Sequence, residues 1–184
     1  MEYSQLTCRQ FVEELASGSA APGGEAAAAL IGAIGTALGN MAMNMPKSDK
    51  KYSEALSDLA SLKNIANEMQ ENFLGRVGTG GREQNPNDRC DTMLTLMKAC
   101  CSAVDLLKSI AAKGPAIALP NVGYGVICCR AALQMASLVV FSSAAELALS
   151  DRKTAAGYTN RANDLLSYTA RADEIYVGVL GRYV

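Results

Sequence analysis

The sequence predicts an all-α fold, an antiparallel bundle of about six helices with long, buried central helices. Apolar residues recur at three- and four-residue spacing in one segment after another, which is the period of an amphipathic helix. Short stretches rich in glycine, proline and asparagine separate these segments, and no run alternates as a strand would. With 184 residues, 49% of them apolar, the chain can build one core. We therefore expect a single helical domain over residues 1–184.

The first helix has clear boundary signals. Thr7 and Gln10 form a capping-box pair, in which each side chain bonds the other residue's backbone amide. Phe11 and Leu15 lie four residues apart and therefore share one face. Gly18 can adopt the left-handed conformation that ends many helices. We expect this helix to end at Gly18.

The second helix runs from about residue 24 to residue 44 and opens at the turn Pro22-Gly23-Gly24-Glu25. It carries no charge between Glu25 and Lys47, which raises the possibility of a membrane span. Alanine and glycine dominate, however, and Asn40 and Asn44 interrupt the apolar run. Small residues recur at helical spacing, at Ala28, Gly32, Gly35 and Gly39. We therefore expect a central helix that another helix backbone approaches closely, in the core or across a subunit interface.

The third and fourth helices flank a glycine-rich loop. The third keeps a helical period from Leu56 to Phe73. Four glycines then fall between residues 75 and 81, which costs too much entropy for a helix, so residues 75–87 are expected to be a loop. Asn87 or Asp88 is expected to cap the fourth helix, which stops at Lys113-Gly114-Pro115.

The last two segments are also helical. The fifth, from about Asn121 to Leu149, has Arg130 as its only charge between residues 122 and 145, which predicts burial on all sides, in a bundle or a dimer. Ser150 is expected to cap the sixth, which keeps a helical period as far as Tyr176.

Composition restricts the possible functions. The net charge is −1 and the only basic cluster is Lys47, Lys50 and Lys51, which argues against a nucleic-acid partner. The first residues lack a signal-peptide pattern, so we expect a cytoplasmic protein with its six cysteines reduced and no metal site. There is no histidine, so acid–base chemistry must use a carboxylate, lysine, cysteine, tyrosine or a positioned water.

Several stretches carry a resemblance to one family. They are Phe11–Ser17, Pro22-Gly23-Gly24, Ala28-Ala29-Leu30, Gly32-Ala33, Asn44, Lys50-Lys51-Tyr52, Lys113-Gly114, Gly123 and Asp151. In these stretches the chain resembles the formimidoyltetrahydrofolate cyclodeaminase domain, whose family also contains a bacterial methenyltetrahydrofolate cyclohydrolase. The resemblance covers about three-quarters of the chain.

The resemblance implies an all-helical dimer or higher oligomer, with a folate site between helices and between subunits. It implies a reaction that closes or opens the imidazolinium ring of a tetrahydrofolate one-carbon unit, with a folate as substrate or ligand and no tightly bound cofactor. It places ligand-binding residues at Pro22, Gly23, Gly24, Asn44, Lys50, Lys51 and Tyr52. The catalytic candidates are Asn121, Lys51 and Glu25.

The chain departs from the family's pattern at several polar positions. Glu25 and Ala26 stand where a third glycine and a serine are usual, and Asn121 stands where an aspartate is usual. Val139 and Ser143 replace two asparagines. These changes leave two alternatives to the family's reaction. One is a catalytically degenerate folate-binding or helical assembly protein. The other is an enzyme for a less anionic substrate, served by Glu25 or by a carboxylate from residues 83–91.

Overall fold

The computed structural model describes residues 3–19, 21–44, 56–78, 85–113 and 116–182, and within these ranges the regular elements are all helices. Two of them are short 3₁₀ helices, Tyr3–Gln5 and Ala116–Ala118. The α-helices are α1 (Cys8–Ala16), α2 (Gly24–Asn44), α4 (Leu56–Arg76), α5 (Pro86–Lys113), α6 (Leu119–Leu147), α7 (Arg152–Leu166) and α8 (Tyr168–Leu180). The predicted all-α fold is confirmed.

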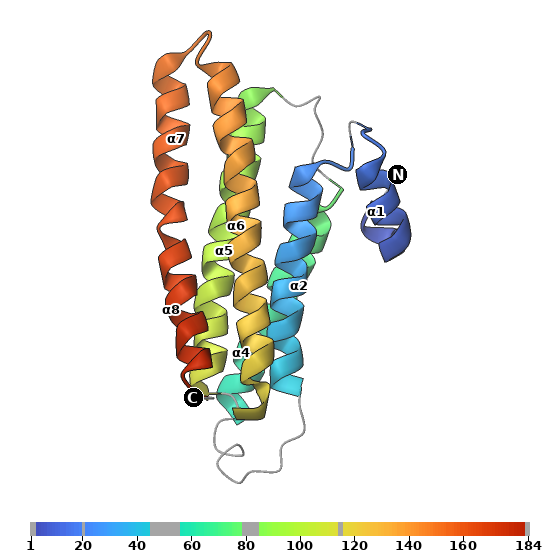
Figure 1. Ribbon diagram of the computed structural model, residues 1–184, viewed down its shortest axis with the longest axis vertical. Coiled ribbons are helices and arrows are strands. Elements are labelled where there is room, and N and C mark those ends of the chain that lie inside the picture. Colours follow the sequence, from blue (N-terminus) through green and yellow to red (C-terminus); the bar gives the residue numbers. More distant parts are fainter. Residues whose placement is uncertain (1–2, 20, 45–55, 79–84, 114–115, 183–184) are drawn as a thin grey trace.

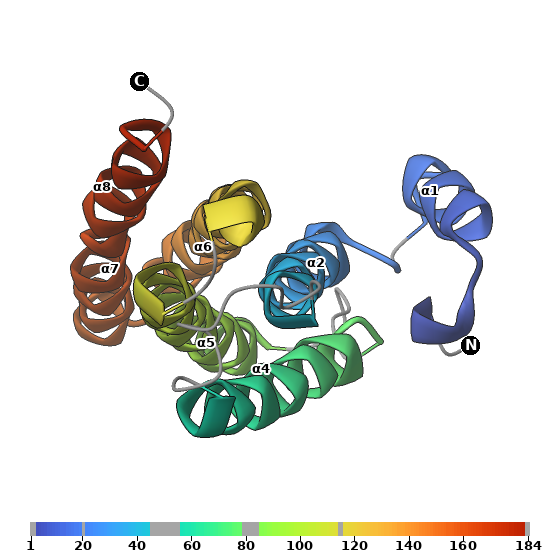
Figure 2. The same cartoon turned by 90° about the horizontal axis from the view of Figure 1, so that it is seen from below.

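The long helices α2, α5 and α6 form the centre of the bundle (Figure 1). Helix α6 packs along both α2 and α5, and α4 lies against α2 and α5. Helices α7 and α8 follow each other end to end on the side of α5 and α6 that faces away from α2 (Figure 2). Helix α1 lies at the edge of the bundle, beyond α2 (Figure 2). The predicted capping box at its start is present, because the Gln10 amide donates to Thr7 Oγ1 at 3.2 Å and the Thr7 amide to Gln10 Oε1 at 3.0 Å.

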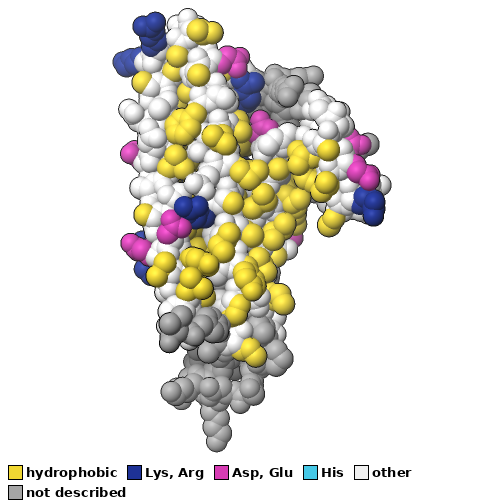
Figure 3. Space-filling model, in the orientation of Figure 1, with side chains coloured by type: hydrophobic (Ala, Val, Ile, Leu, Met, Phe, Trp, Pro, Cys, Tyr) yellow, Lys and Arg dark blue, Asp and Glu magenta, His cyan; other side chains and the backbone are white. Residues whose placement is uncertain are grey.

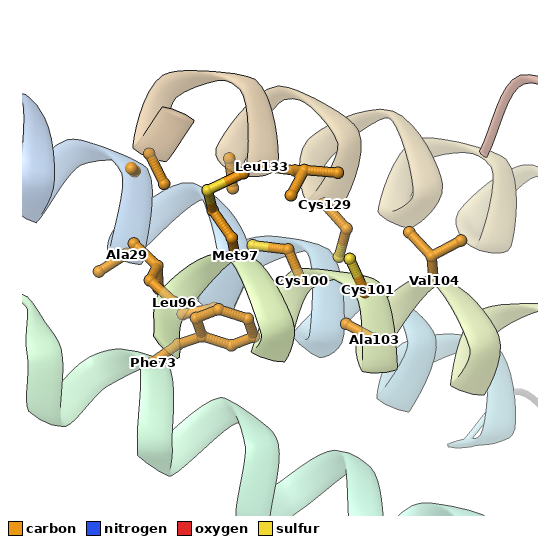
Figure 4. Close-up of a cluster of buried hydrophobic side chains, with 14 of the residues drawn as sticks. Ala29, Phe73, Leu96, Met97, Cys100, Cys101, Ala103, Val104, Cys129 and Leu133 are labelled. Carbon is orange, nitrogen blue, oxygen red and sulfur yellow. The ribbon is translucent and has the colours of Figure 1, made fainter. Parts of the chain in front are cut away.

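The core is built from the facing sides of these helices. Phe73 of α4 is fully buried beside Leu96 of α5, and Met97 of α5 lies against Leu133 of α6 (Figure 4). Cys129 of α6 points into the same cluster (Figure 4). Burial of these large side chains is the main favourable contribution to the fold.

Glycines permit the close crossing of α2 and α6. A Cβ atom added at Gly35 would lie 2.6 Å from Cys129 Sγ and 2.9 Å from the carbonyl oxygen of Gly125. A Cβ atom at Gly125 would lie 2.7 Å from the Gly35 carbonyl oxygen. Gly32 is similarly close to the Phe73 ring, at 2.6 Å. The small-residue spacing in α2 therefore serves core packing inside this chain, which is one of the two alternatives that the sequence left open.

Two predicted helix caps were wrong by one or more residues. Asn85 caps α5, since its Oδ1 accepts from the Asp88 amide at 3.0 Å, and Pro86 occupies the first helical position, where its missing N–H costs nothing. Asp151, not Ser150, caps α7, and its Oδ1 accepts from the Thr154 amide at 3.0 Å. The predicted sixth segment is divided at Ser167 into α7 and α8.

The prediction that the fifth segment is buried on all sides fails within the single chain. Helix α6 leaves Tyr124, Ile127 and Leu138 exposed, the last by 68% of its surface. Helix α2 exposes Ile34 and Met41 beside them, and apolar side chains gather over both helices in Figure 3. Both helices are long and apolar enough to cross a membrane, but 67% of the relevant α2 window is buried inside the protein, which is typical of a core helix.

Candidate functional site

A polar cavity lies at the end of the bundle where α2 and α5 begin and α6 ends (the upper end in Figure 1). Its volume is about 580 Å³, within the range of small-molecule sites. The residues that line it are Ser19, Gly23, Gly24, Glu25, Arg89, Val139, Ser142, Ser143 and Glu146. The turn singled out in the sequence therefore borders an open cavity that core side chains do not fill.

The start of α2 forms one wall. Pro22 is buried and anchors the turn, while Gly23 and Gly24 lie at the surface of the cavity. The Gly23 carbonyl oxygen accepts the Ala27 amide at 3.2 Å, so the first helical turn begins at this glycine. Glu25, in that first turn, lines the cavity and is partly exposed. Among the described residues it forms no ion pair.

Arg89 forms the opposite wall. It extends from the first turns of α5 to the last third of α6, where its Nε donates to Ser143 Oγ at 3.1 Å. Its guanidinium also forms a close ion pair with Glu146. The Arg89 side chain is only 16% exposed, whereas Glu146 is 56% exposed. Two of the charges in the cavity are thus already paired with each other.

Sequence reasoning missed Arg89 because it searched residues 83–91 for carboxylates. Of those carboxylates, Glu83 lies outside the described residues. Asp88 accepts from the Asn85 side chain at 2.6 Å, and Asp91 accepts from the Tyr158 hydroxyl at 3.0 Å. Neither aspartate lines the cavity. The sequence feature that could have indicated this contact was Ser143, which was named only as a replacement of one of the family's asparagines.

The predicted site residues do not form one cluster within the chain. Pro22, Gly23, Gly24 and Glu25 lie at the cavity, but Asn44 ends α2 and Asn121 lies in the first turn of α6, at the other end of the bundle (Figure 1). Because α2 has 21 residues, the two ends are about 30 Å apart. Lys50, Lys51 and Tyr52 lie outside the described residues.

The cavity offers acid–base and hydrogen-bonding groups. Its carboxylates can accept a proton from water, its serine hydroxyls can donate or accept, and the one cation of its described lining, Arg89, is paired with Glu146. Within the described part of the chain, no group of three or more His, Cys, Asp or Glu side chains could hold a metal ion. The arrangement suits a small polar molecule that gains or loses a proton.

The family can now be assigned. A family model described as formiminotransferase-cyclodeaminase matches residues 7–78 and 82–164. The chain belongs to this family. Its resemblance to the cyclodeaminases, predicted from the glycine turn and its helix, is confirmed.

The chain is similar to two known proteins, one by sequence and one by structure. The methenyltetrahydrofolate cyclohydrolase of Methylorubrum extorquens is 27% identical over 164 residues, which cover 75% of this chain and 79% of the relative. The crystal structure of formiminotetrahydrofolate cyclodeaminase from Thermotoga maritima superposes with a TM-score of 0.79 and 16% identity, over 97% of this chain and 100% of that one. At this identity the second match establishes the shared fold.

Proposed function

We propose that this protein is an enzyme of tetrahydrofolate one-carbon metabolism that hydrolyses a 5,10-methenyltetrahydrofolate. The observation that carries the proposal is the open cavity beside Pro22–Glu25, lined by carboxylates and hydroxyls, in a chain of this family. The similarity to the cyclohydrolase of Methylorubrum extorquens supports the choice of reaction, since the alignment covers most of both chains. The alternative reaction within the same family is that of a formimidoyltetrahydrofolate cyclodeaminase.

The hydrolysis needs only a positioned water and acid–base groups. Water adds to the methenyl carbon and loses a proton, which gives a tetrahedral intermediate. The bond between that carbon and N5 then breaks, the carbinol oxygen loses its proton to form the formyl group, and N5 takes up a proton, so that one proton is released overall. Glu25 and Glu146 are the cavity groups that can accept a proton from the water, which matters in a chain without histidine.

The cyclodeaminase reaction would use the same groups in a related way. N10 attacks the formimidoyl carbon and gives up its proton, the nitrogen of the formimidoyl group takes up two protons, one from N10 and one from an acid or water in the cavity, and ammonia leaves as the methenyl cation forms. Both reactions pass through a tetrahedral carbon bonded to both N5 and N10, so one cavity can serve either reaction.

We propose further that the protein works as a homodimer through the exposed apolar face of α2 and α6. This face, which includes Ile34, Met41 and Leu138, is continuous across the two helices and almost free of charge (Figure 3). A patch of this kind on a protein surface marks an interaction site. The same face of a second copy can pack against it without burying an unpaired charge.

The same dimer would unite the separated site residues. A two-fold axis perpendicular to α2 reverses the direction of the helices in the partner. The Pro22–Glu25 turn of one subunit would then approach the end of the bundle that carries the partner subunit's Asn44 and the partner subunit's Asn121. This arrangement supports the composite site that the family resemblance implies. The proposal also includes a cytoplasmic location, a folate as the ligand and no tightly bound cofactor.

The test is the loss of the methenyltetrahydrofolate absorbance band with purified protein, together with ammonia release from 5-formiminotetrahydrofolate. A rate above the buffer blank that falls in Glu25→Gln would support the proposal. If neither substrate reacts, calorimetry with folates separates the alternatives. Tight binding without turnover would indicate a folate-binding protein, and no binding would indicate an assembly protein.

A further inference from the structure

We propose that Glu25 makes the cavity selective for a positively charged one-carbon unit, an imidazolinium or amidinium group, over its neutral counterparts. The inference rests on the proposed function and assigns a specificity-determining role to a residue that departs from the family's usual turn. A carboxylate at this position repels an anionic group and attracts a cationic one.

The charges of the cavity support this role. Its described lining contains two carboxylates, Glu25 and Glu146, and one guanidinium, Arg89. Arg89 donates to Glu146 and to the Ser143 hydroxyl, so its positive charge is already offset by a carboxylate inside the cavity. Glu25 remains as the unpaired charge of the described lining, so the described side chains of the cavity sum to one negative charge.

The helix ends do not reverse this sign. The starts of α2 and α5 each contribute about half a positive charge near the cavity, and the end of α6 contributes about half a negative charge. Together the helix ends contribute about half a positive charge, which is smaller in magnitude than the one negative charge of the described side chains. Because Glu25 lies in the first turn of α2, it also directly offsets the dipole of that helix.

The chemistry of the proposed substrates fits a negative cavity. In a 5,10-methenyl unit the positive charge is shared by two nitrogens across one carbon, and a protonated formimidoyl unit carries the same N–C–N cation. A formyl product is a neutral amide. A carboxylate at the cavity therefore favours the charged substrate over the neutral product, which helps the product of hydrolysis to leave.

The inference can be tested by binding, without turnover. Formamidinium and formamide are matched in size and differ in charge, and their affinities can be measured by NMR titration of the Gly23 and Gly24 amide signals. We expect the wild-type protein to bind formamidinium about tenfold more tightly than formamide, which corresponds to about 1.4 kcal/mol. Glu25→Gln should remove this preference.

Two further variants sharpen the result. Glu71→Gln makes the same change at an exposed position of α4 that lines no described pocket, and it should keep the tenfold preference. Glu146→Gln frees the Arg89 guanidinium and should weaken formamidinium binding while allowing acetate to bind. Equal affinities in the wild-type protein, or an unchanged preference in Glu25→Gln, would overturn the inference. Charge-selective binding without any folate turnover would overturn only the proposed function.

Discussion

The Nε atom of Arg89 lies 3.1 Å from the Oγ atom of Ser143, and this hydrogen bond joins the beginning of α5 to the last third of α6. The same guanidinium pairs with Glu146 one turn further along α6. Ser143 is almost fully buried and Arg89 is mostly buried, so these contacts are shielded from water on one side. They hold the two helices together at the wall of the cavity.

Arg89→Ala should therefore lower the free energy of unfolding by about 1–3 kcal/mol, because it leaves a buried hydroxyl and a carboxylate without their partner. Urea denaturation followed by circular dichroism measures the change. Arg130→Ala is the matched control, since its side chain is 35% exposed and pairs with Asp173 of α8. The control should lose about 1 kcal/mol or less. Equal losses in the two variants would contradict a special role for the Arg89 contacts.

The glycines of the α2–α6 crossing should be intolerant of even one methyl group. Gly35→Ala forces a Cβ atom against Cys129 Sγ and the Gly125 carbonyl oxygen, and the backbone oxygen cannot move aside. We expect a loss of about 1–3 kcal/mol in the free energy of unfolding. Gly157→Ala, in the middle of α7 with open space around its Cα, should instead stabilise the protein by about 0.5–1 kcal/mol. The opposite signs can be read from two urea curves.

The fold was largely predictable because its signals are local. The capping box of Thr7 and Gln10 and the helical spacing of Gly32, Gly35 and Gly39 each lie within one helix, and the structure reproduces both. The cavity depends instead on contacts such as that between Arg89 and Ser143, which are 54 residues apart. Sequence spacing says nothing about which turn of α5 faces which turn of α6. The sequence therefore indicated the glycine turn that borders the cavity, but it gave no indication of Arg89.

The exposed face of α2 and α6 provides a test of the dimer. Leu138→Glu places a charge at a position that is 68% exposed in the single chain, so it should leave the fold intact. If a second copy covers this position, the buried charge should convert the protein to a monomer, as measured by light scattering after gel filtration. Val177→Glu, at 63% exposure on α8, is the matched control and should stay dimeric. A monomer from Val177→Glu alone would place the interface on α8.

The buried thiol of Cys101 should make the protein less stable at high pH. Burial, and to a smaller extent the nearby Asp105, raises the pKa of this thiol from 9.0 to about 11. Between these values the unfolded chain loses the thiol proton while the folded protein keeps it, so stability falls as the pH rises through this window. The contribution is about 3 kcal/mol, fully present below pH 9 and lost towards pH 11.

Urea denaturation of the wild-type protein and of Cys101→Ala at several pH values isolates this contribution. Burial also raises the pKa values of Cys90 and Tyr158, but Cys101 does not contribute to either shift, so both groups cancel in the difference. The wild-type protein should lose more stability than the variant between pH 9 and pH 11. Parallel curves would mean that the Cys101 thiol ionises equally well in the folded protein, and hence that the core between α5 and α7 admits water beside it.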